Sequence, residues 1–547
     1  MKSREPMISI FEYWSVILLN VRFSHFVLAL ILLFIVRALT QRLTNKGPMI
    51  WPLMGVIPSV LLNINDVFNY FAEYLNQCGG TFAIRATCMD RFCGIMTVDT
   101  SSIEYILKTN FVNYHKGEAF IDLFSDVFGN GFFVADGETW KDQRLALTSV
   151  MHTFWFIESS HSVIQDLVHQ KLLKLINKSV KLDKLTDLQD LLLRFTSDNI
   201  YITTFGIDPG CLAIELPDVP FVTAFERAAD LSYYRVFTPT FIWKTLRFFS
   251  VGPEKKLKEA VRIVHKSVSE IVKNRRIDLH KSGSVNDRSD VLSRLVIMKD
   301  PEDKQNLNDR FSDDMLRDLC LSFILAGRDT TSVALAWFFW LINKHPHVEN
   351  LILNEIKVTI SHRKCDSKNI NEIVFTADEL KKMVYLEAAL SETLRLYPSV
   401  PHDIKEARED DVLPNGTAVK KKDLIVYSMY SIARTEAIWG KDCREFKPER
   451  WIKNGKSVVE SQFKFLAFNG GPRLCVGKQF AYIQMKMVAA SILLRYSVKV
   501  VEGQTVVPKV KTTLYMKNGL LVNFKPRLEH TFGSSTHKES GFPQEAM

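Results

Sequence analysis

One cysteine of the chain stands in the stretch Phe468-Asn469-Gly470-Gly471-Pro472-Arg473-Leu474-Cys475-Val476-Gly477, and a helical run, Lys478-Gln479-Phe480-Ala481-Tyr482, follows at once. A thiolate at Cys475 would meet backbone N–H groups and the positive end of the helix dipole, and both lower the pKa of a thiol. Gly471, Pro472 and Gly477 add little side-chain bulk, so a flat ligand could approach the sulfur. Arg473 offers a cation two residues away. The loop predicts a ligating cysteine, against the alternative of a buried, inert thiol.

The composition predicts a large packed core. Hydrophobic residues make up 47% of the 547 positions and aromatic residues 11%, with 37 phenylalanines, whereas disordered chains are poor in both. The length favours two or more units, but no internal repeat or long linker divides the chain. The eight cysteines form no C-x-x-C pair, which favours a reducing compartment.

The formal net charge of +9 is modest for a chain of this length. A basic balance of this size fits an anionic membrane surface or an acidic protein partner. Nucleic acid would need a concentrated basic stripe, which the sequence lacks, so we expect no nucleic-acid partner.

Residues 1–46 are predicted to be a membrane anchor with a basic flank. The chain is apolar from Tyr13 to Leu39, interrupted chiefly by Asn20, Arg22 and His25. A full span needs about 20 apolar residues, so this run suffices if Arg22 snorkels to the interface. Basic residues follow the run, which places the next domain on the cytosolic side of a single-pass helix. The alternative is a buried core helix.

Residues 312–343 are predicted to form one long helix that carries Ala-Gly-Arg-Asp-Thr-Thr at positions 326–331. Glycine and adjacent threonines lower helix stability, so their place in an apolar helix calls for an explanation. The small residues Ala326 and Gly327 would open a groove for a ligand. The hydroxyl of Thr330 can bond to the carbonyl of Ala326, four residues back. Asp329 and Thr330 would then be a carboxylate and a hydroxyl beside a cavity, as proton delivery requires; the alternative is a kinked helix with an incidental aspartate.

Two further pairs of residues have helical spacing. Trp140 and Arg144 stand at i and i+4, and Glu392 and Arg395 stand at i and i+3 within an apolar segment. Taken alone, each is more often a surface contact of little energetic value. The stretch Phe446-Lys447-Pro448-Glu449-Arg450-Trp451 follows the second pair.

Taken together and in this order, W-x-x-x-R, A-G-x-D-T-T, E-x-x-R and the cysteine loop resemble the cytochrome P450 superfamily over about residues 47–527. The resemblance implies a mainly α fold with small β-sheets, in which haem b lies between a long distal helix and the helix after the cysteine loop. It implies a catalytic domain at residues 47–528; the polar residues 529–547 are expected to be disordered.

The resemblance also implies a role for each motif. Cys475 would be the thiolate ligand of the haem iron, and Asp329 with Thr330 would deliver protons. Glu392, Arg395 and Arg450 would form a buried triad that braces the cysteine loop. The remaining residues would contact the haem, the first three at its propionates: Trp140, Arg144, Arg473, Phe468, Gly471 and Gly477.

Residues 326–349, 468–486 and 513–521 look like the plant branch that hydroxylates fatty acids at the terminal carbon. This similarity implies a fatty-acid substrate, O2, and electrons from NADPH passed on by NADPH-cytochrome P450 reductase. It also implies a place in the endoplasmic reticulum membrane. Candidate positioning segments are Phe120–Phe133, Phe221–Phe237, Leu321–Leu325, Val400–Pro401 and Leu514–Met516.

Three alternatives stay open at this point. A hydroperoxide isomerase or dehydratase could share the cysteine loop, but it would have no need of Asp329 and Thr330. A monooxygenase could act on another lipophilic substrate. A non-catalytic haem protein would gain little from the proton-delivering pair.

Overall fold

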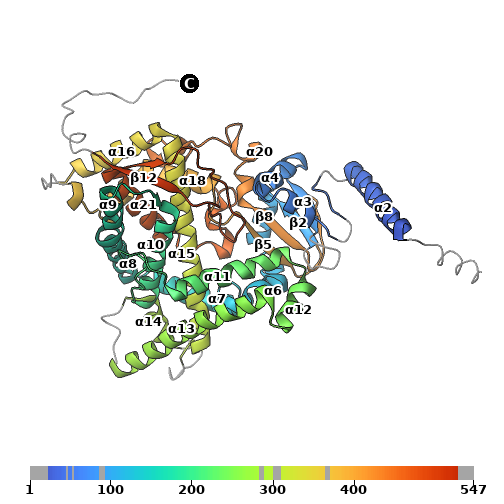
Figure 1. The fold of residues 1–547 in the computed structure, drawn as a ribbon, viewed down its shortest axis with the longest axis horizontal. Helices are drawn as coiled ribbons and strands as arrows, with labels where there is room; N and C mark the ends of the chain where they lie inside the picture. The colour runs from blue at the N-terminus through green and yellow to red at the C-terminus, as the bar shows by residue number, and fades with distance from the viewer. Residues whose placement is uncertain are drawn as a thin grey trace, which may run out of the picture.

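The computed structural model describes residues 23–44, 47–51, 54–85, 93–282, 289–299, 309–363 and 370–527. The tail expected to be disordered and the first part of the expected anchor lie outside these ranges. Within them the chain is mainly helical with small β-sheets, as the sequence predicts (Figure 1).

The N-terminal half is mainly helical, with a few short strands between its helices. Its helices are α2 (Phe23–Thr44), α3 (Ile57–Leu62), α4 (Val67–Gln77), α5 (Thr100–Glu104), α6 (Gly117–Phe128), α7 (Gly137–Met151), α8 (Phe154–Asp166), α9 (Leu173–Lys181), α10 (Leu188–Phe205), α11 (Pro220–Tyr234), α12 (Thr240–Phe248) and α13 (Gly252–Ser282). The later helices are α14 (Val291–Val296), α15 (Asp313–Lys344), α16 (Pro346–Ser361), α17 (Ala377–Lys382), α18 (Val384–Leu396), α19 (Met429–Ile432), α20 (Glu436–Trp439) and α21 (Lys478–Arg495).

The strands form one five-stranded sheet and three smaller sheets. The largest has the order β1 (Thr81–Arg85), β2 (Cys93–Thr97), β8 (Leu424–Ser428), β5 (His402–Ala407) and β3 (Tyr114–His115). β11 (Tyr496–Val500), β12 (Leu521–Pro526) and β4 (Thr186–Asp187) form a second sheet. The two-stranded sheets pair β6 (Asp411–Val412) with β7 (Ala418–Val419), and β9 (Ile452–Lys453) with β10 (Lys456–Ser457).

The long helix α15 runs through the middle of the molecule (Figure 1). It begins at Asp313 because the hydroxyl of Ser312 accepts the amide of Met315 over 3.3 Å, and acidic residues occupy its positive end. It ends at Lys344, two residues before Pro346 opens α16. This confirms the predicted long helix.

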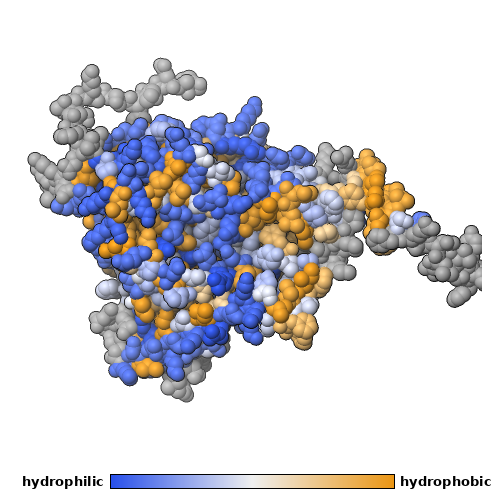
Figure 2. Space-filling view, viewed as in Figure 1, coloured by the Kyte–Doolittle hydropathy of each residue, from blue (hydrophilic) through white to orange (hydrophobic). Residues whose placement is uncertain are grey.

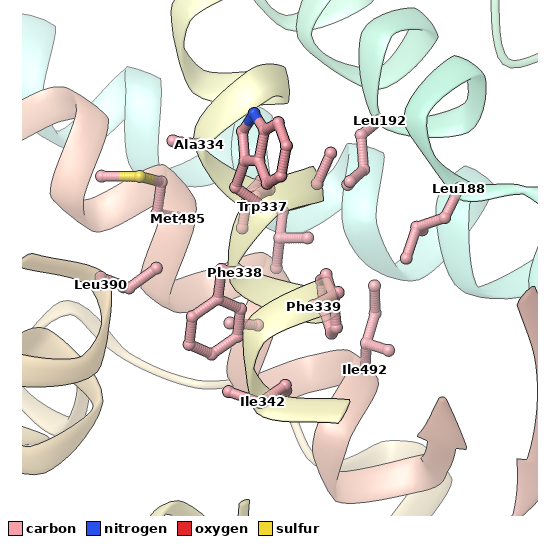
Figure 3. Packing of buried hydrophobic residues seen from close by; sticks show 14 of the residues in the cluster. Leu188, Leu192, Ala334, Trp337, Phe338, Phe339, Ile342, Leu390, Met485 and Ile492 are labelled. Atoms are coloured by element: carbon pink, nitrogen blue, oxygen red, sulfur yellow. The ribbon is translucent and has the colours of Figure 1, made fainter. Parts of the chain in front are cut away.

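The core surrounds α15 on several sides. Figure 3 shows Trp337, Phe338 and Phe339 of α15 among buried side chains of three other helices. Those neighbours are Leu188 and Leu192 of α10, Leu390 of α18, and Met485 and Ile492 of α21. The helix after the cysteine loop is therefore fixed against the long helix through shared apolar packing.

Gly327 has a different use from the one expected. A Cβ at this position would lie 2.3 Å from Cδ1 of Ile200 on α10. The missing side chain lets α10 approach α15, so Gly327 serves helix packing. Of the two small residues, Ala326 is the one that stays exposed.

The apolar helix α2 projects from the body of the molecule (Figure 1). Leu28, Leu32, Leu33 and Val36 are each more than half exposed. The alternative prediction, a buried core helix, is therefore wrong for α2. By length and composition α15 is the helix of the described residues that could cross a membrane, yet most of it is buried; the apolar part of α2, Ser24–Thr40, is shorter.

Candidate active site

The cysteine loop is closed by backbone hydrogen bonds. The amide of Cys475 donates to the carbonyl of Phe468 over 2.8 Å, and that of Leu474 to the carbonyl of Gly471 over 3.0 Å. Gly471 has φ +62°, and a Cβ there would lie 2.0 Å from the carbonyl oxygen of Leu107. Packing against this neighbouring backbone already requires glycine, independently of any ligand.

Gly477 and Phe468 stand on either side of the cysteine. A Cβ at Gly477 would lie 3.9 Å from Sγ of Cys475, which is an ordinary contact distance, so the protein alone does not demand glycine there. The ring of Phe468 lies 5.4 Å from that of Tyr482 on α21, which ties the start of the loop to the helix that follows it.

The thiol of Cys475 is exposed and yet surrounded by protein, so it borders an interior recess. Burial raises its pKa, while a hydrogen bond from the backbone of Gly477 and the charges of Arg144 and Lys478 lower it. The loop therefore supplies the N–H donor and the cations that a thiolate needs.

The predicted cations near the cysteine lie together. The guanidinium of Arg473 donates to Asp136 over 2.7 Å and to the carbonyl of Ala135 over 2.8 Å. It also lies 4.5 Å from the ring centre of Trp140. Burial and the charge of Arg473 lower the pKa of Arg144, while Cys475 raises it. The structure thus brings together the four predicted residues of this group, Trp140, Arg144, Arg473 and Cys475.

A buried acid–base cluster beside Arg473 was missed by the sequence reasoning. Asp403 accepts hydrogen bonds from Lys116 over 2.6 Å and from the hydroxyl of Tyr427 over 2.7 Å. Despite burial, the charges of Lys116 and Lys405 hold the pKa of Asp403 well below its usual range. These residues come from three distant segments, so no local motif could have indicated them.

Two donors of this cluster lack partners. Nζ of Lys405, which is fully buried, and Nε of Arg473 have no hydrogen-bond partner among the residues that the structure describes. Burial, followed by the charges of Lys116 and Arg473, lowers the pKa of Lys405 well below its usual value. Buried donors without an acceptor are costly, so an acidic ligand group is the missing complement.

These residues fit a haem. The orphaned cationic donors suit its two propionate carboxylates, and Cys475 offers one thiolate. Across the described ranges no group of three His, Cys, Asp or Glu side chains could hold a metal ion. A single thiolate beside carboxylate-binding cations suits a metal that is carried by a macrocycle rather than caged by the protein.

One short face of α15 is accessible inside the molecule. From Asp318 to Phe339 every residue is buried except Ala326, which is exposed, and Gly327 and Thr330, which are half-buried. The hydroxyl of Thr330 donates to the carbonyl of Ala326 over 2.7 Å, which confirms the predicted back-bond. The hydroxyl is thereby held on the accessible face of the helix.

Asp329 lies in a different environment from Thr330. It is buried, and the guanidinium of its neighbour Arg328 donates to it over 2.7 Å. Burial raises the pKa of Asp329 in spite of the charge of Arg328. A second carboxylate, Glu226 of α11, lies 3.4 Å from the same guanidinium. The sequence indicated Asp329 but gave no sign of the groups around it.

Glu392, Arg395 and Arg450 are brought together. Arg395 makes a bidentate ion pair with Glu392 over 2.7 and 2.8 Å, and Nε of Arg450 lies 3.4 Å from the same carboxylate. The indole of Trp451 donates to Glu392 over 2.8 Å. The ring of Trp451 lies 4.6 Å from that of Phe465, close to the cysteine loop.

The phenylalanine-rich segments form one apolar cluster with α15. Rings of Phe120, Phe124, Phe128 and Phe133 lie 4.8 to 5.8 Å apart, and Phe225 of α11 joins them. Three of the five candidate positioning segments contribute to this cluster, the third being Leu321–Leu325. Leu514–Met516 belongs to a separate part of the core.

Comparisons with known proteins cover nearly the whole chain. The sequence model of the family described as Cytochrome P450 matches residues 46–526. Cytochrome P450 86B1 of Arabidopsis thaliana is 43% identical over 511 residues, which are 93% of this chain and 90% of that protein. Alkane hydroxylase MAH1 of Arabidopsis thaliana is 35% identical over 480 residues, 87% of this chain and 93% of the relative. Noroxomaritidine synthase 2 of Narcissus pseudonarcissus is 34% identical over 492 residues, which are 89% of this chain and 93% of that protein.

Proposed function

The chain belongs to the cytochrome P450 family, and we propose that it hydroxylates fatty acids at the terminal carbon. Its family identity makes it a monooxygenase that uses haem b, receives NADPH-derived electrons from a reductase and takes a lipophilic substrate. The observation that carries the finer proposal is the accessible face of α15 next to an apolar, phenylalanine-rich cluster. A hydrocarbon chain can be held by such a wall without leaving polar groups unpaired.

We assign the residues of the site separate roles in binding haem and in delivering protons. Cys475 would bind the haem iron, and Arg144, Arg473 and Lys405 would hold the propionates. Thiolate-bound haem supplies the activation of O2 for C–H hydroxylation. Thr330 places a hydroxyl on the accessible face, and Asp329 would pass protons to it from the interior of the helix bundle.

Selectivity for the terminal carbon would come from positioning. A terminal C–H bond is harder to break than those of the neighbouring methylene groups, so the protein must hold the chain end at the reacting centre. Phe120, Phe133 and Leu325 belong to the cluster beside this face and are the residues we propose for that role. The relative named an alkane hydroxylase supports a hydrocarbon substrate.

We also propose that the protein is anchored in the endoplasmic reticulum membrane, with residues 47–528 as the catalytic domain on the cytosolic side. Apolar side chains gather on α2 and again over α12, toward the same side of the molecule (Figure 2). Phe241, Phe248 and Phe249 are each more than half exposed. An exposed apolar surface of this kind suits a lipid interface.

Product analysis tests the proposed function. The protein should be expressed in microsomes with a reductase and supplied with fatty acids of graded chain length. We expect ω-hydroxylated products whose formation needs both O2 and NADPH. Conversion of a hydroperoxide without either would favour the isomerase. Turnover of other lipophilic compounds but of no fatty acid would favour a different monooxygenase substrate, as the similarity to noroxomaritidine synthase allows.

A further inference from the structure

A chain of ion pairs connects Asp329 to the surface. Arg328 bonds to Asp329 over 2.7 Å and lies 3.4 Å from Glu226. Lys511 lies 3.4 Å from the other oxygen of Glu226 and 2.7 Å from Asp230. The side chain of Arg328 is 3% exposed, whereas those of Glu226 and Asp230 are 42% and 41% exposed. The inner end of the chain is buried, and its outer end meets solvent.

Asp329 and Glu226 share one guanidinium. Arg328 must stay paired with at least one of the two carboxylates, because its charge is buried and an unpaired buried cation is costly. In the structure Nη1 of Arg328 bonds to Asp329 while Nη2 lies 3.4 Å from Glu226. A closer pairing with Glu226 would draw the guanidinium away from Asp329 and favour a proton on that carboxylate. When Arg328 favours Asp329, that carboxylate stays ionised. Lys511 enters this competition because it binds Glu226 from the other side.

We propose that Glu226 and Lys511 are positioning residues that set whether Asp329 holds a proton, acting through the guanidinium that Glu226 shares with it. The inference rests on the proposed role of Asp329 as a proton donor. It adds residues of α11 and of the C-terminal segment, neither of which belongs to a recognised motif of the sequence.

The charges of Glu226 and Lys511 shift the pKa of Asp329 in the directions that the proposal requires. Apart from burial and Arg328, the negative charge of Glu226 raises the pKa of Asp329, and the positive charge of Lys511 lowers it. Tyr515 also faces this carboxylate, and its buried hydroxyl lowers the pKa of Asp329. Further charged and polar groups of the cluster are Asp230 of α11, Lys509 of the C-terminal segment and Ser197 of α10, which bonds to Arg328 over 3.1 Å.

Two substitutions should move the same property in opposite directions. Glu226→Gln removes the competing charge, so Asp329 should lose its proton at a pH lower by about one unit. Lys511→Met frees Glu226 to bind Arg328, so Asp329 should keep its proton to a pH higher by about one unit. Because Lys511 acts through Glu226, the double variant should resemble Glu226→Gln rather than Lys511→Met. Glu215→Gln, in the segment before α11, and Lys517→Met, in the C-terminal segment, remove exposed charges and serve as controls.

The protonation state can be read without turnover. Infrared spectroscopy of protein with 13C-labelled aspartate, as a difference against Asp329→Asn, reports the protonated carboxyl band of Asp329 over pH. In the reconstituted enzyme, the pH at which product formed per NADPH consumed begins to fall should shift with the same sign. Each variant is first checked for the reduced-CO spectrum of the wild type.

The results separate this inference from the proposed function. Opposite shifts of the carboxyl band in the two variants support the inference, whatever the substrate proves to be. Equal shifts, or no shift in two folded variants, overturn it even if fatty acids are hydroxylated normally. Normal infrared shifts together with no fatty-acid turnover would leave the inference standing and reject the proposed substrate.

Discussion

Arg395 donates two parallel hydrogen bonds to Glu392, from Nε to Oε2 over 2.7 Å and from Nη2 to Oε1 over 2.8 Å, and both side chains are buried. The same carboxylate accepts the indole N–H of Trp451. From Trp451 ring contacts lead to Phe465 and then to Phe468, whose carbonyl accepts the amide of Cys475. The ion pair is thereby connected to the loop that carries the cysteine.

Breaking this pair should unfold the region around the cysteine loop. Arg395→Met leaves Glu392 buried without its bidentate partner, and such a loss costs about 3–5 kcal/mol. Arg450→Met should cost less, because Arg450 lies 3.4 Å from Glu392, farther than Arg395 does. In this variant Glu392 keeps its bidentate partner, and the other side chain that loses a contact is Asp442. Thermal unfolding and haem content measure both. Equal losses in the two variants would contradict the ranking.

The sequence predicted the parts of this fold that depend on local pattern. The helix predicted at 312–343 ends within one residue of α15 at each side, and the helical run that begins at Lys478 is the start of α21. Capping by Ser312 and the back-bond of Thr330 are set by residues three or four positions apart, so they can be read from spacing alone.

Long-range contacts could not be predicted in this way. Gly327 is required by Ile200, and Gly471 by the backbone of Leu107, although both glycines suggested a ligand. Lys405 and Glu226 gain their importance from charges that are brought near them only by folding. A single sequence carries no local signal for such contacts.

Cys475→Ala should abolish thiolate ligation of the haem. The reduced protein with CO should lose the red-shifted absorption band that is typical of thiolate ligation, because no sulfur remains on the loop. Cys443→Ala is the matched control, since Cys443 is a buried cysteine near the bracing ion pair rather than in the loop. The spectrum of that control should keep its position; an unchanged spectrum in Cys475→Ala would reject the ligand assignment.

Thr330→Ala should uncouple oxygen consumption from product formation. The hydroxyl that is held at the carbonyl of Ala326 would be lost from the accessible face of α15, while helix packing stays the same. General acid–base groups contribute about 10²–10⁴-fold, so the ratio of product to NADPH should fall by at least about tenfold. Thr331→Ala changes a buried neighbour and should keep the wild-type ratio. Wild-type coupling in Thr330→Ala would exclude the proposed role.

Deleting residues 1–46 should weaken membrane binding without ending it. The exposed rings of Phe248 and Phe249 on the α12 side remain and should hold part of the protein on membranes. Adding Phe248→Asp and Phe249→Asp to the deletion should release it, as sedimentation with microsomes would show. Phe154→Asp with Trp155→Asp changes an exposed aromatic pair on α8, away from α2 in Figure 1, and should have little effect. Full release by the deletion alone would limit the membrane contact to residues 1–46.

Stability should fall as the pH is lowered from about 6.5 to about 4 because of His169. Burial and the charge of Arg495 lower the pKa of His169 to about 4, so the folded protein binds this proton later than the unfolded chain does. The folded state is therefore favoured fully above the unfolded pKa and loses that advantage as the pH falls through this window. His169→Gln removes the titrating group. The thermal unfolding midpoint of this variant should therefore change less between pH 7 and pH 5 than the midpoint of the wild type does. His152→Gln, at an exposed histidine after α7, is the matched control. Parallel pH dependence of the wild type and His169→Gln would show that other groups govern acid stability.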